Sequence, residues 1–277
     1  MAGHGGTHRD DGRDDGFGDG LGDGRTESVK SARRTVALLE FLADADRRLT
    51  HAELRRGLGI PKSSLHELLR TLVASGWVEV DERGTGYGVG LRALRVGAAY
   101  LDRDPVVRAA APLLAQLRRE LDETVHLARL DGAEVVYLTS QESQHQLRVM
   151  SRIGRRLPAH ATALGKALLA TRTDDEVDAL LPAVLPALTP YTVTDRAALH
   201  AELAEARHRG WASERGQNTP GLGCFGVAVP GRTPARYAVS CSLPLARLTA
   251  GHQRQIVAAL LECAGELSIT EAGWTER

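Results

Sequence analysis

Hydrophobic and polar positions alternate with a helical period over the first part of the chain. From residue 29 onward, apolar residues recur three and four positions apart, which predicts a helix. The apolar side of this helix is formed by Val29, Ala32, Val36, Leu39 and Ala43. A later helix, with Pro61 in its first turn and Gly76 as its stop signal, shows a wider stripe, typical of one buried face. Its members are Leu65, Leu68, Leu69, Leu72 and Val73.

Between these two helices lies a short helix with clear start and stop signals. Residues 50–53, Thr-His-Ala-Glu, match a capping box, in which the Thr hydroxyl and the Glu carboxylate satisfy amides at a helix start. Gly57 and Gly59 end this helix, and Pro61 suits the first turn of the next one. After Gly76, residues 77–80 and 87–89 alternate as a hairpin. The stretch therefore predicts a helix-turn-helix followed by a wing.

The rest of the chain alternates between helices and pairs of strands. An amphipathic helix over residues 91–101 is followed by a helix that begins at Asp104-Pro105 and ends near residue 121. Strands 125–130 and 135–139 are joined at Asp131-Gly132, a strong hairpin signal. Helices at 161–170 and 195–209, strands at 223–229 and 237–243, and a final helix complete the pattern. Strand pairs separated by helices favour an α+β domain around a mostly antiparallel sheet.

Composition narrows the class of protein. With 277 residues, 43% of them hydrophobic, the chain is long enough for two domains with separate cores. No apolar run is long enough for a membrane span, and no signal-peptide core is present at the N-terminus. Three cysteines without CxxC spacing fit a reducing cytoplasm better than a disulfide framework or zinc ribbon. We therefore expect a cytoplasmic protein.

The formal net charge is zero, but the charge is unevenly distributed. Residues 1–25 are rich in Gly and Asp, have little to bury and are predicted to be disordered. Their DG repeats lack the full period of calcium-binding nonapeptides, so a solvated tail is the preferred interpretation. Because partners respond to local fields, an acidic tail does not exclude a basic DNA-binding surface elsewhere.

The second helix of a helix-turn-helix reads base edges from its outer face, and neighbouring groups contact phosphates. The candidate DNA-binding residues lie on this helix, on the helix before it and at the wing tip. They are Thr50, Arg55, Arg56, Lys62, Ser63, Ser64, His66, Arg70 and Arg83. The alternative is a small helical packing module with a solvated charged face. The capping box, the Gly-x-Pro turn, the Ser-Ser start and the wing together favour DNA.

Several longer strings resemble a known family. They include SVKSARRTVALLEFL, LTHAELRRGLGIPKSSLHELLRTLVASGWVEV, DETVHLARLDGAEVVYL, GRRLPAHATALGKALLA and RHRGWASERGQNTPGLGCFGVAVP. Together they resemble IclR-type transcriptional regulators over roughly residues 27–270, and HATALGKALLA is particularly specific. The resemblance implies a winged helix-turn-helix domain over 26–90, a linker helix over 91–104 and a GAF- or PAS-like effector-binding domain over 105–272.

The resemblance also implies partners and a second site. They are a palindromic double-stranded DNA operator, a second copy of the chain in a dimer or dimer of dimers, and a small effector such as an organic or aromatic acid. No cofactor, metal site, catalytic residue or membrane partner is expected. By position, the effector-binding residues are Ala163, Leu164, Glu214, Leu222, Cys224, Ser240 and Ser242. Independently, amides at the helix start near residues 161–165 can hold a carboxylate, and serines two apart share one strand face.

Two segments depart from the family pattern. Residues 218–221, Asn-Thr-Pro-Gly, replace an acidic pair, and the hairpin at 230–234 is short. Both are expected to flank the effector pocket, so a regulator that binds DNA without a ligand is the alternative function. A hydrolase using Cys224 with His160 or His126 is a further alternative, although no Gly-x-Ser-x-Gly, His-Glu-x-x-His or phosphate-loop motif is present. We expect His160 to cap or orient the following helix, Lys166 to anchor a turn, and Cys263 to lie in the core.

Overall fold

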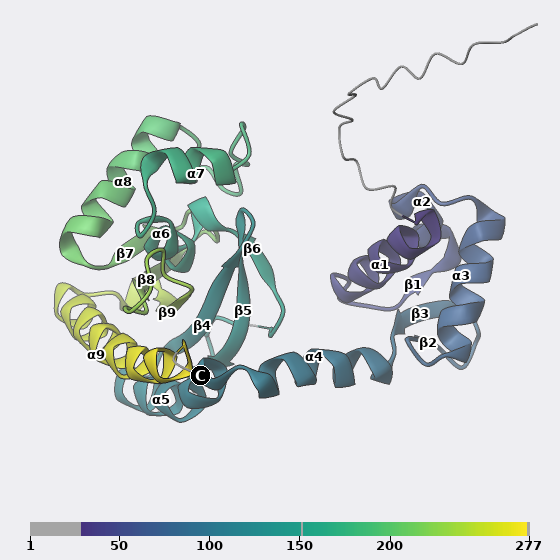
Figure 1. The fold of residues 1–277 in the computed structure, drawn as a ribbon, viewed down its shortest axis with the longest axis horizontal. Coiled ribbons are helices and arrows are strands. Elements are labelled where there is room, and N and C mark those ends of the chain that lie inside the picture. The colour runs from purple at the N-terminus through teal and green to yellow at the C-terminus, as the bar shows by residue number, and fades with distance from the viewer. Residues whose placement is uncertain (1–28, 151, 276–277) are drawn as a thin grey trace, which may run out of the picture. The chain divides into compact units, whose positions relative to one another are not determined.

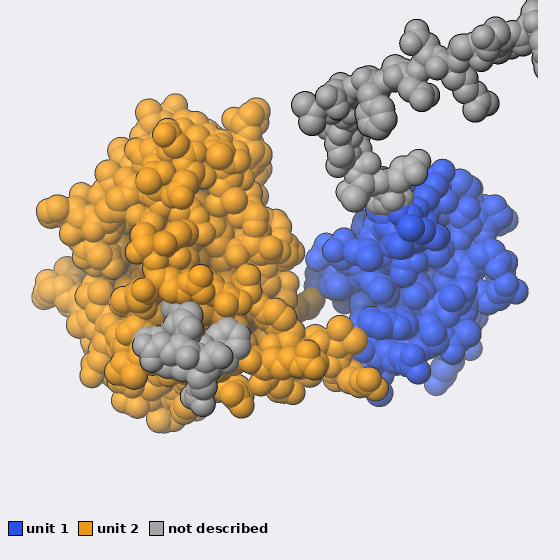
Figure 2. Space-filling view, in the orientation of Figure 1, with its two compact units in different colours: residues 1–93 blue, residues 94–277 orange. Residues whose placement is uncertain are grey.

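The computed structural model describes residues 29–150 and 152–275. The chain divides into two compact units, with the boundary between Ala93 and Leu94 (Figure 2). Each unit is considered by itself below. The predicted tail at residues 1–25 lies outside the described residues.

The first unit consists of helices packed on a small antiparallel sheet (Figure 1). The sheet has the strand order β1-β3-β2, so the wing predicted after the second helix of the motif is present. The core is formed by leucines from all three helices, together with Ile60 and Val78. The elements are α1 (Lys30–Ala43), β1 (Leu49–Thr50), α2 (His51–Leu58), α3 (Lys62–Ala74), β2 (Val78–Val80) and β3 (Gly86–Val89).

Local signals fixed most of this unit correctly, with three exceptions. The capping box at α2 is confirmed, but Pro61 is the N-cap of α3 and lies just outside its first turn. Gly57 lies inside α2 and does not end it, because the helix continues to Leu58 and Gly59 is its C-cap. Glycine is needed at position 57 because a Cβ there would come within 2.3 Å of the Phe41 ring. The predicted face of α1 is also wrong. Leu38 and Leu42 are its buried residues, because α1 carries apolar residues on two sides and the period alone does not choose between them.

The helix α4 (Leu91–Arg103) crosses the boundary between the units, and none of its residues is buried. The second unit follows with six strands and the remaining helices. No helix within the described ranges is long and apolar enough to cross a membrane. The elements are α5 (Pro105–Leu121), β4 (Thr124–Asp131), β5 (Glu134–Gln141), β6 (Arg156–Pro158), η1 (Ala159–Ala161), α6 (Ala163–Leu169), α7 (Asp174–Leu180), α8 (Arg196–Arg209), β7 (Ala212–Arg215), β8 (Leu222–Ala228), β9 (Tyr237–Pro244), η2 (Leu245–Arg247) and α9 (Ala250–Thr275).

The six strands form one antiparallel sheet in the order β6-β5-β4-β9-β8-β7, which confirms the predicted α+β fold. Helices α5 and α9 pack together against one face, where side chains such as Leu127, Phe225 and Val239 form the larger core. Helices α6, α7 and α8 lie at the other face (Figure 1), where Ala128, Tyr137 and Leu164 belong to a second core. Side chains that alternate along a strand thus pack into two different hydrophobic cores, one on each face of the sheet.

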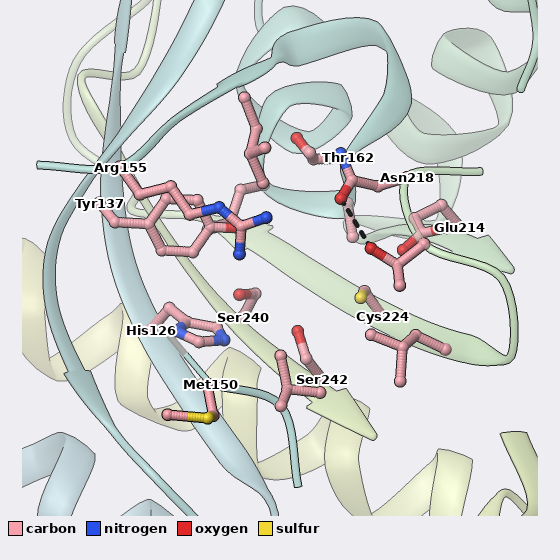
Figure 3. Close-up of a pocket in the computed structure, with 16 residues that line it drawn as sticks. His126, Tyr137, Met150, Arg155, Thr162, Glu214, Asn218, Cys224, Ser240 and Ser242 are labelled. Carbon is pink, nitrogen blue, oxygen red and sulfur yellow. Dashed lines mark hydrogen bonds between the residues drawn. The ribbon is translucent and has the colours of Figure 1, made fainter. Parts of the chain in front are cut away.

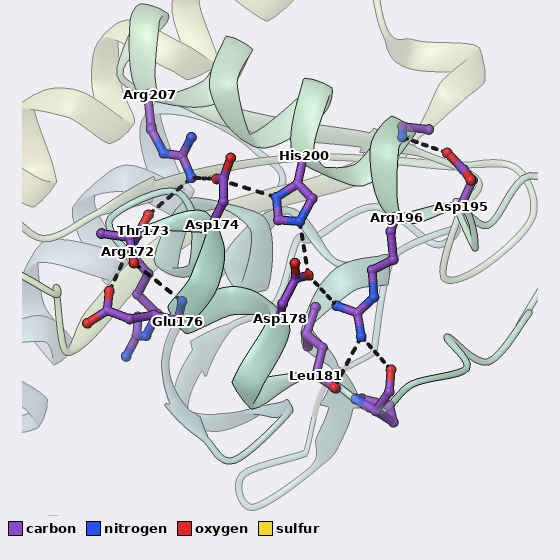
Figure 4. A network of polar contacts seen from close by, with 12 residues as sticks. Arg172, Thr173, Asp174, Glu176, Asp178, Leu181, Asp195, Arg196, His200 and Arg207 are labelled. Carbon is purple, nitrogen blue, oxygen red and sulfur yellow. Dashed lines mark hydrogen bonds and ion pairs between the residues drawn. The ribbon is translucent and has the colours of Figure 1, made fainter.

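A polar network joins α7 to α8 at the outer side of this second core (Figure 4). The Arg207 guanidinium donates to Asp174 at 2.6 Å and to the carbonyls of Ala170 and Arg172. The His200 ring lies between Asp174 and Asp178, 3.3 and 3.0 Å from their carboxylates. The network fixes α7 and α8 against the segment that follows α6.

Candidate functional site

The candidate DNA-binding residues lie on α3, at both ends of α2 and in the wing turn. Eight of the nine have exposed side chains, and Ser64 is half-buried. Lys62 and Ser63 occupy the first turn of α3, where amides without helical partners favour an anionic neighbour such as phosphate. Arg83 lies in the exposed turn between β2 and β3. Most of these side chains are therefore accessible to a partner, and Lys62, Ser63 and His66 border one surface hollow.

The structure adds His51, a residue of this surface that the sequence reasoning missed. His51 borders a surface hollow together with Lys62, Ser63 and His66. Partial burial lowers the pKa of His51, and the positive charges of His66, Lys62 and Arg55 lower it further. Its position as the first residue of α2, directly after the N-cap, is the signal that could have identified it. The basic side chains around His51 concentrate positive charge where DNA is expected.

Two candidate residues are already engaged in local contacts. The Thr50 hydroxyl accepts the Glu53 amide and donates to the Glu53 carboxylate at 2.8 Å, so it supports the start of α2. The Arg70 guanidinium pairs with Glu67 one turn earlier, and both side chains are exposed. Exposed pairs of this kind are worth about 0–1 kcal/mol, so Arg70 can exchange its partner for a phosphate or a base at little cost.

In the second unit, strand register brings polar residues into two neighbouring rows on the α6 side of the sheet. Glu214, Cys224, Ser242 and Thr124 lie opposite one another across β7, β8, β9 and β4. The next inward row, two residues along each strand, contains Gly226, Ser240 and His126. Because side chains two apart point to the same face, both rows face the same space.

Helix α6 begins directly above these rows because Gly226 leaves room for it. A Cβ on Gly226 would lie 2.6 Å from the Ala163 carbonyl oxygen, so only glycine allows this approach. The Thr162 hydroxyl caps the helix by accepting the Gly165 amide at 3.0 Å. The first residues of α6, Ala163 and Leu164, are thereby held over the sheet.

A cavity lies between α6 and the two rows (Figure 3). All seven predicted effector-binding residues line it, although segments from residue 163 to residue 242 contribute them. Its volume is about 40 Å³, enough for a few water molecules. The lining residues are His126, Tyr137, Val149, Met150, Arg155, Leu157, Thr162, Ala163, Leu164, Glu214, Asn218, Thr219, Leu222, Cys224, Ser240 and Ser242.

Burial keeps most ionisable groups of the cavity uncharged. Burial lowers the pKa of His126 to about 3, and the positive charge of Arg155 contributes further, so the ring is neutral at pH 7. The His126 Nδ1 atom lies 2.9 Å from the Ser140 hydroxyl. Burial also raises the pKa of the Cys224 thiol well above its usual value, and the Glu214 carboxylate raises it further. A thiol that stays protonated is a poor nucleophile, which argues against hydrolase chemistry at Cys224.

Glu214 is the acidic group of the cavity. Burial raises the pKa of its carboxyl, while hydrogen bonds with Cys224 and the Gln217 amide, the latter 2.8 Å away, act in the opposite direction. Gln217 in turn accepts a hydrogen bond from Lys166 at 2.6 Å, and Lys166 also pairs with Glu202. Lys166 is only 1% exposed. Through these contacts it links α6 to α8 and to the segment after β7, whereas the sequence predicted that it anchors a turn.

The outcomes of the other predictions near the site are mixed. Of the two roles expected for His160, capping α6 is wrong, because Thr162 provides the cap. The His160 Nε2 atom lies 3.1 Å from the Pro186 carbonyl oxygen. The hairpin at 230–234 does not line the cavity, because it joins β8 to β9 at the end opposite Leu222. The altered loop does contribute, through Asn218 and Thr219. Cys263 is buried in the core against α5 and the sheet, as predicted.

Comparison with known proteins identifies the chain. The model of the IclR helix-turn-helix domain matches residues 31–82, and that of the bacterial transcriptional regulator IclR C-terminal domain matches residues 98–269. The chain belongs to the IclR family. It is 31% identical to the transcriptional repressor IclR of Escherichia coli (strain K12) over 253 residues, which cover 90% of this chain and 92% of that protein. It is therefore a DNA-binding transcriptional regulator of the IclR type and not an enzyme.

Solved structures show the same architecture. An IclR transcriptional regulator from Alicyclobacillus acidocaldarius aligns with a TM-score of 0.79 and 26% identity, covering 87% of this chain and 98% of that one. An IclR homolog from Microbacterium hydrocarbonoxydans, crystallised with 4-hydroxybenzoate, aligns with a TM-score of 0.74 and 25% identity, with 87% and 98% coverage. The predicted order of an N-terminal winged helix-turn-helix and a C-terminal α+β domain is thus confirmed.

Proposed function

We propose that this IclR-family regulator is a cytoplasmic repressor that binds a palindromic operator as a dimer or dimer of dimers. We keep the domain limits 26–90, 91–104 and 105–272 as part of this proposal. The single observation that carries the DNA-binding part is the exposed face of α3, where Lys62, Ser63, His66 and Arg70 share one surface. A helix of this kind enters the major groove and reads base edges. The repressor mode follows that of the Escherichia coli relative, which is named a transcriptional repressor.

Exposed apolar residues support self-association. Helix α4 exposes Leu91, Leu94 and Val96, and Val36 of α1 and its N-cap residue Val29 are exposed as well. A second copy of the chain would remove these side chains from water, and two-fold symmetry would then match two half-sites about one helical turn apart. In sedimentation velocity, Leu94→Glu is expected to shift the protein toward monomer. An unchanged sedimentation coefficient in Leu94→Glu and Val36→Glu would count against these surfaces.

Fluorescence anisotropy with DNA from the region upstream of the gene tests operator binding. We expect saturable binding whose affinity falls as the logarithm of the salt concentration rises. Lys62→Ala should weaken binding to all sequences alike, whereas Ser63→Ala and His66→Ala should relax base preference by about 1–3 kcal/mol per contact. Arg119→Ala, an exposed arginine on α5, is the control and should leave affinity unchanged. Equal affinity for operator and random DNA would contradict the proposal.

We further propose that a small organic-acid-like effector binds in the cavity beneath α6 and changes operator affinity. Its support is that all seven residues implied by the family resemblance line one cavity, beside hydroxyl groups and α6 amides. A structural relative was crystallised with an aromatic acid. Thermal-shift screening against small acids tests binding, because a ligand that prefers the folded state raises the melting temperature.

One observation favours a second candidate, a regulator without a ligand. The cavity volume of about 40 Å³ is well below the 300–1,000 Å³ of typical small-molecule sites. An effector would have to widen the rim, which includes Met150, a side chain that is 68% exposed. If no acid raises the melting temperature or changes operator affinity, the ligand-independent function is the correct one.

A further inference from the structure

The two neighbouring arginines at residues 155 and 156 have opposite environments. The Arg156 guanidinium donates to Asp131 and Glu134 at 2.7 Å each, on the outer side of β4 and β5. The Arg155 side chain points into the cavity instead (Figure 3), and among the described residues it has no carboxylate partner. Consecutive residues of an extended chain point to opposite faces, which explains why one arginine is paired and the other faces the cavity.

The backbone of Arg155 is well anchored. Its carbonyl accepts the Tyr137 amide at 3.0 Å, and the Gly154 amide donates to the Tyr137 carbonyl at 2.8 Å. The side chain therefore starts from a fixed point at the cavity rim. Among the described residues that line the cavity, Arg155 is the only one with a full positive charge, because the His126 ring is neutral.

The opposite side of the cavity offers both hydrogen-bond acceptors and an unused hydrogen-bond donor. Glu214 lies there and offers acceptor oxygens (Figure 3). Asn218 lies beside it, and its buried Nδ2 atom has no hydrogen-bond partner among the described residues. A hydroxyl group is both a donor and an acceptor, so a single ligand hydroxyl can donate to Glu214 and accept from Asn218.

We propose that the cavity selects a small hydroxy acid, whose carboxylate pairs with Arg155 and whose distal hydroxyl bonds to Glu214 and Asn218. This inference rests on the proposed effector function and names the ligand class and the residues that determine it. Arginine binds a carboxylate through two parallel hydrogen bonds, which gives direction as well as strength. Because Arg155 and Met150 lie at the exposed rim, they can move outward to admit the ligand while the buried walls keep their positions.

Isothermal titration calorimetry with matched probes tests the proposal. The probes are glycolate and 4-hydroxybenzoate, each beside its neutral amide, and benzoate as the partner of 4-hydroxybenzoate that lacks the hydroxyl. The wild-type protein should bind an acid about 10- to 100-fold more tightly than its amide, the range expected for a hydrogen-bonded charge. It should also prefer 4-hydroxybenzoate to benzoate.

Substitutions at Arg155 and Asn218 test the contacts at the two ends of the ligand separately. Arg155→Gln should abolish the preference for acid over amide, and Arg155→Lys should retain part of it. Asn218→Ala should reduce the preference for 4-hydroxybenzoate over benzoate and leave the acid preference intact. Arg156→Gln is the matched control, since its side chain points away from the cavity, and it should bind each probe within about 2-fold of wild type. Melting curves without ligand check that each variant is folded.

The outcomes distinguish the two proposals. If the wild-type protein binds no probe, and no small acid raises its melting temperature, the effector function fails and this inference fails with it. If acids bind but Arg155→Gln binds them as tightly as wild type, the role of Arg155 is overturned while the effector function stands. A wild-type protein that prefers amides to acids would overturn the inference in the same way, without reference to any variant.

Discussion

Replacing Arg247 by methionine should cost the second unit a large part of its stability. The Arg247 guanidinium donates to both carboxylate oxygens of Glu123, at 2.6 and 2.5 Å. The Glu123 side chain is only 2% exposed, so Arg247 pairs with a carboxylate that is almost completely buried. A third hydrogen bond of Arg247, 3.0 Å long, goes to the Leu147 carbonyl in the segment that leads to Val149 and Met150 at the cavity.

The magnitude follows from what the substitution leaves behind. Removing one partner of a buried pair costs about 3–5 kcal/mol, because the remaining charge is buried and unpaired. The Arg247 side chain is 26% exposed, so water can reach part of the site and we expect the lower end, about 3 kcal/mol. For a unit of this size, that corresponds to a melting temperature lower by about 6–12 °C.

Differential scanning calorimetry of the full chain measures this effect, and a double substitution identifies its cause. Glu123→Gln together with Arg247→Met removes the buried charge, so the double variant should be more stable than Arg247→Met alone. If Arg247→Met melts within about 2 °C of wild type, the pair contributes little and the reasoning fails. Strict additivity of the two single substitutions would refute it as well, because it would show that the two side chains do not interact.

Three further predictions concern single contacts. Gly57→Ala should destabilise the first unit by about 1–3 kcal/mol in urea unfolding, because the added Cβ meets the Phe41 ring at 2.3 Å, although alanine is the better helix former. Tyr237→Phe should lower the melting temperature of the second unit and cost about 1.5–3 kcal/mol, because its hydroxyl donates to the buried Asp104 carboxylate at 2.6 Å. Hydrogen bonds from Arg47 and Thr50 lower the pKa of Glu53 from 4.5 to about 2, so its stabilising contribution is present above about pH 4.5 and is lost as the pH falls toward 2. Glu53→Gln should flatten this part of the pH profile of unfolding, and an unchanged profile would contradict the assignment.

The first unit was largely predictable because its signals are local. A capping box, a turn and a buried stripe each lie within about ten residues, and the structure confirms the order of helices and the wing. The error at α1 has the same origin. When a helix has apolar residues on two sides, the choice between Val36 and Leu38 as the buried one depends on distant partners that the local pattern does not contain.

The cavity shows the limit of local reasoning more clearly. Family strings supplied seven of its residues, but His126, Tyr137 and Arg155 were missed as parts of it. His126 faces Ser240 only because β4 pairs with β9, which lies more than one hundred residues later. The consecutive arginines 155 and 156 were a signal for this role, since two consecutive side chains in an extended segment point to opposite faces. Within the described ranges no carboxylate pairs with Arg155, because Asp131 of β4 and Glu134 of β5 pair with Arg156 instead, which the sequence alone does not show.

The altered loop at residues 218–221 acquires a physical meaning from this geometry. Within the described part of the cavity lining, Arg155 is the only arginine or lysine and Glu214 the only acidic residue, so their formal charges cancel when both are ionised. The acidic pair that the family resemblance implies at this loop would add a carboxylate beside Glu214. At about 6 Å and an effective dielectric constant of about 20, one added negative charge opposes an anionic ligand by about 3 kcal/mol, or about 100-fold in affinity. Asn218 avoids this repulsion and adds a hydrogen-bond donor, so the departure from the family pattern is compatible with the acid effector that we propose.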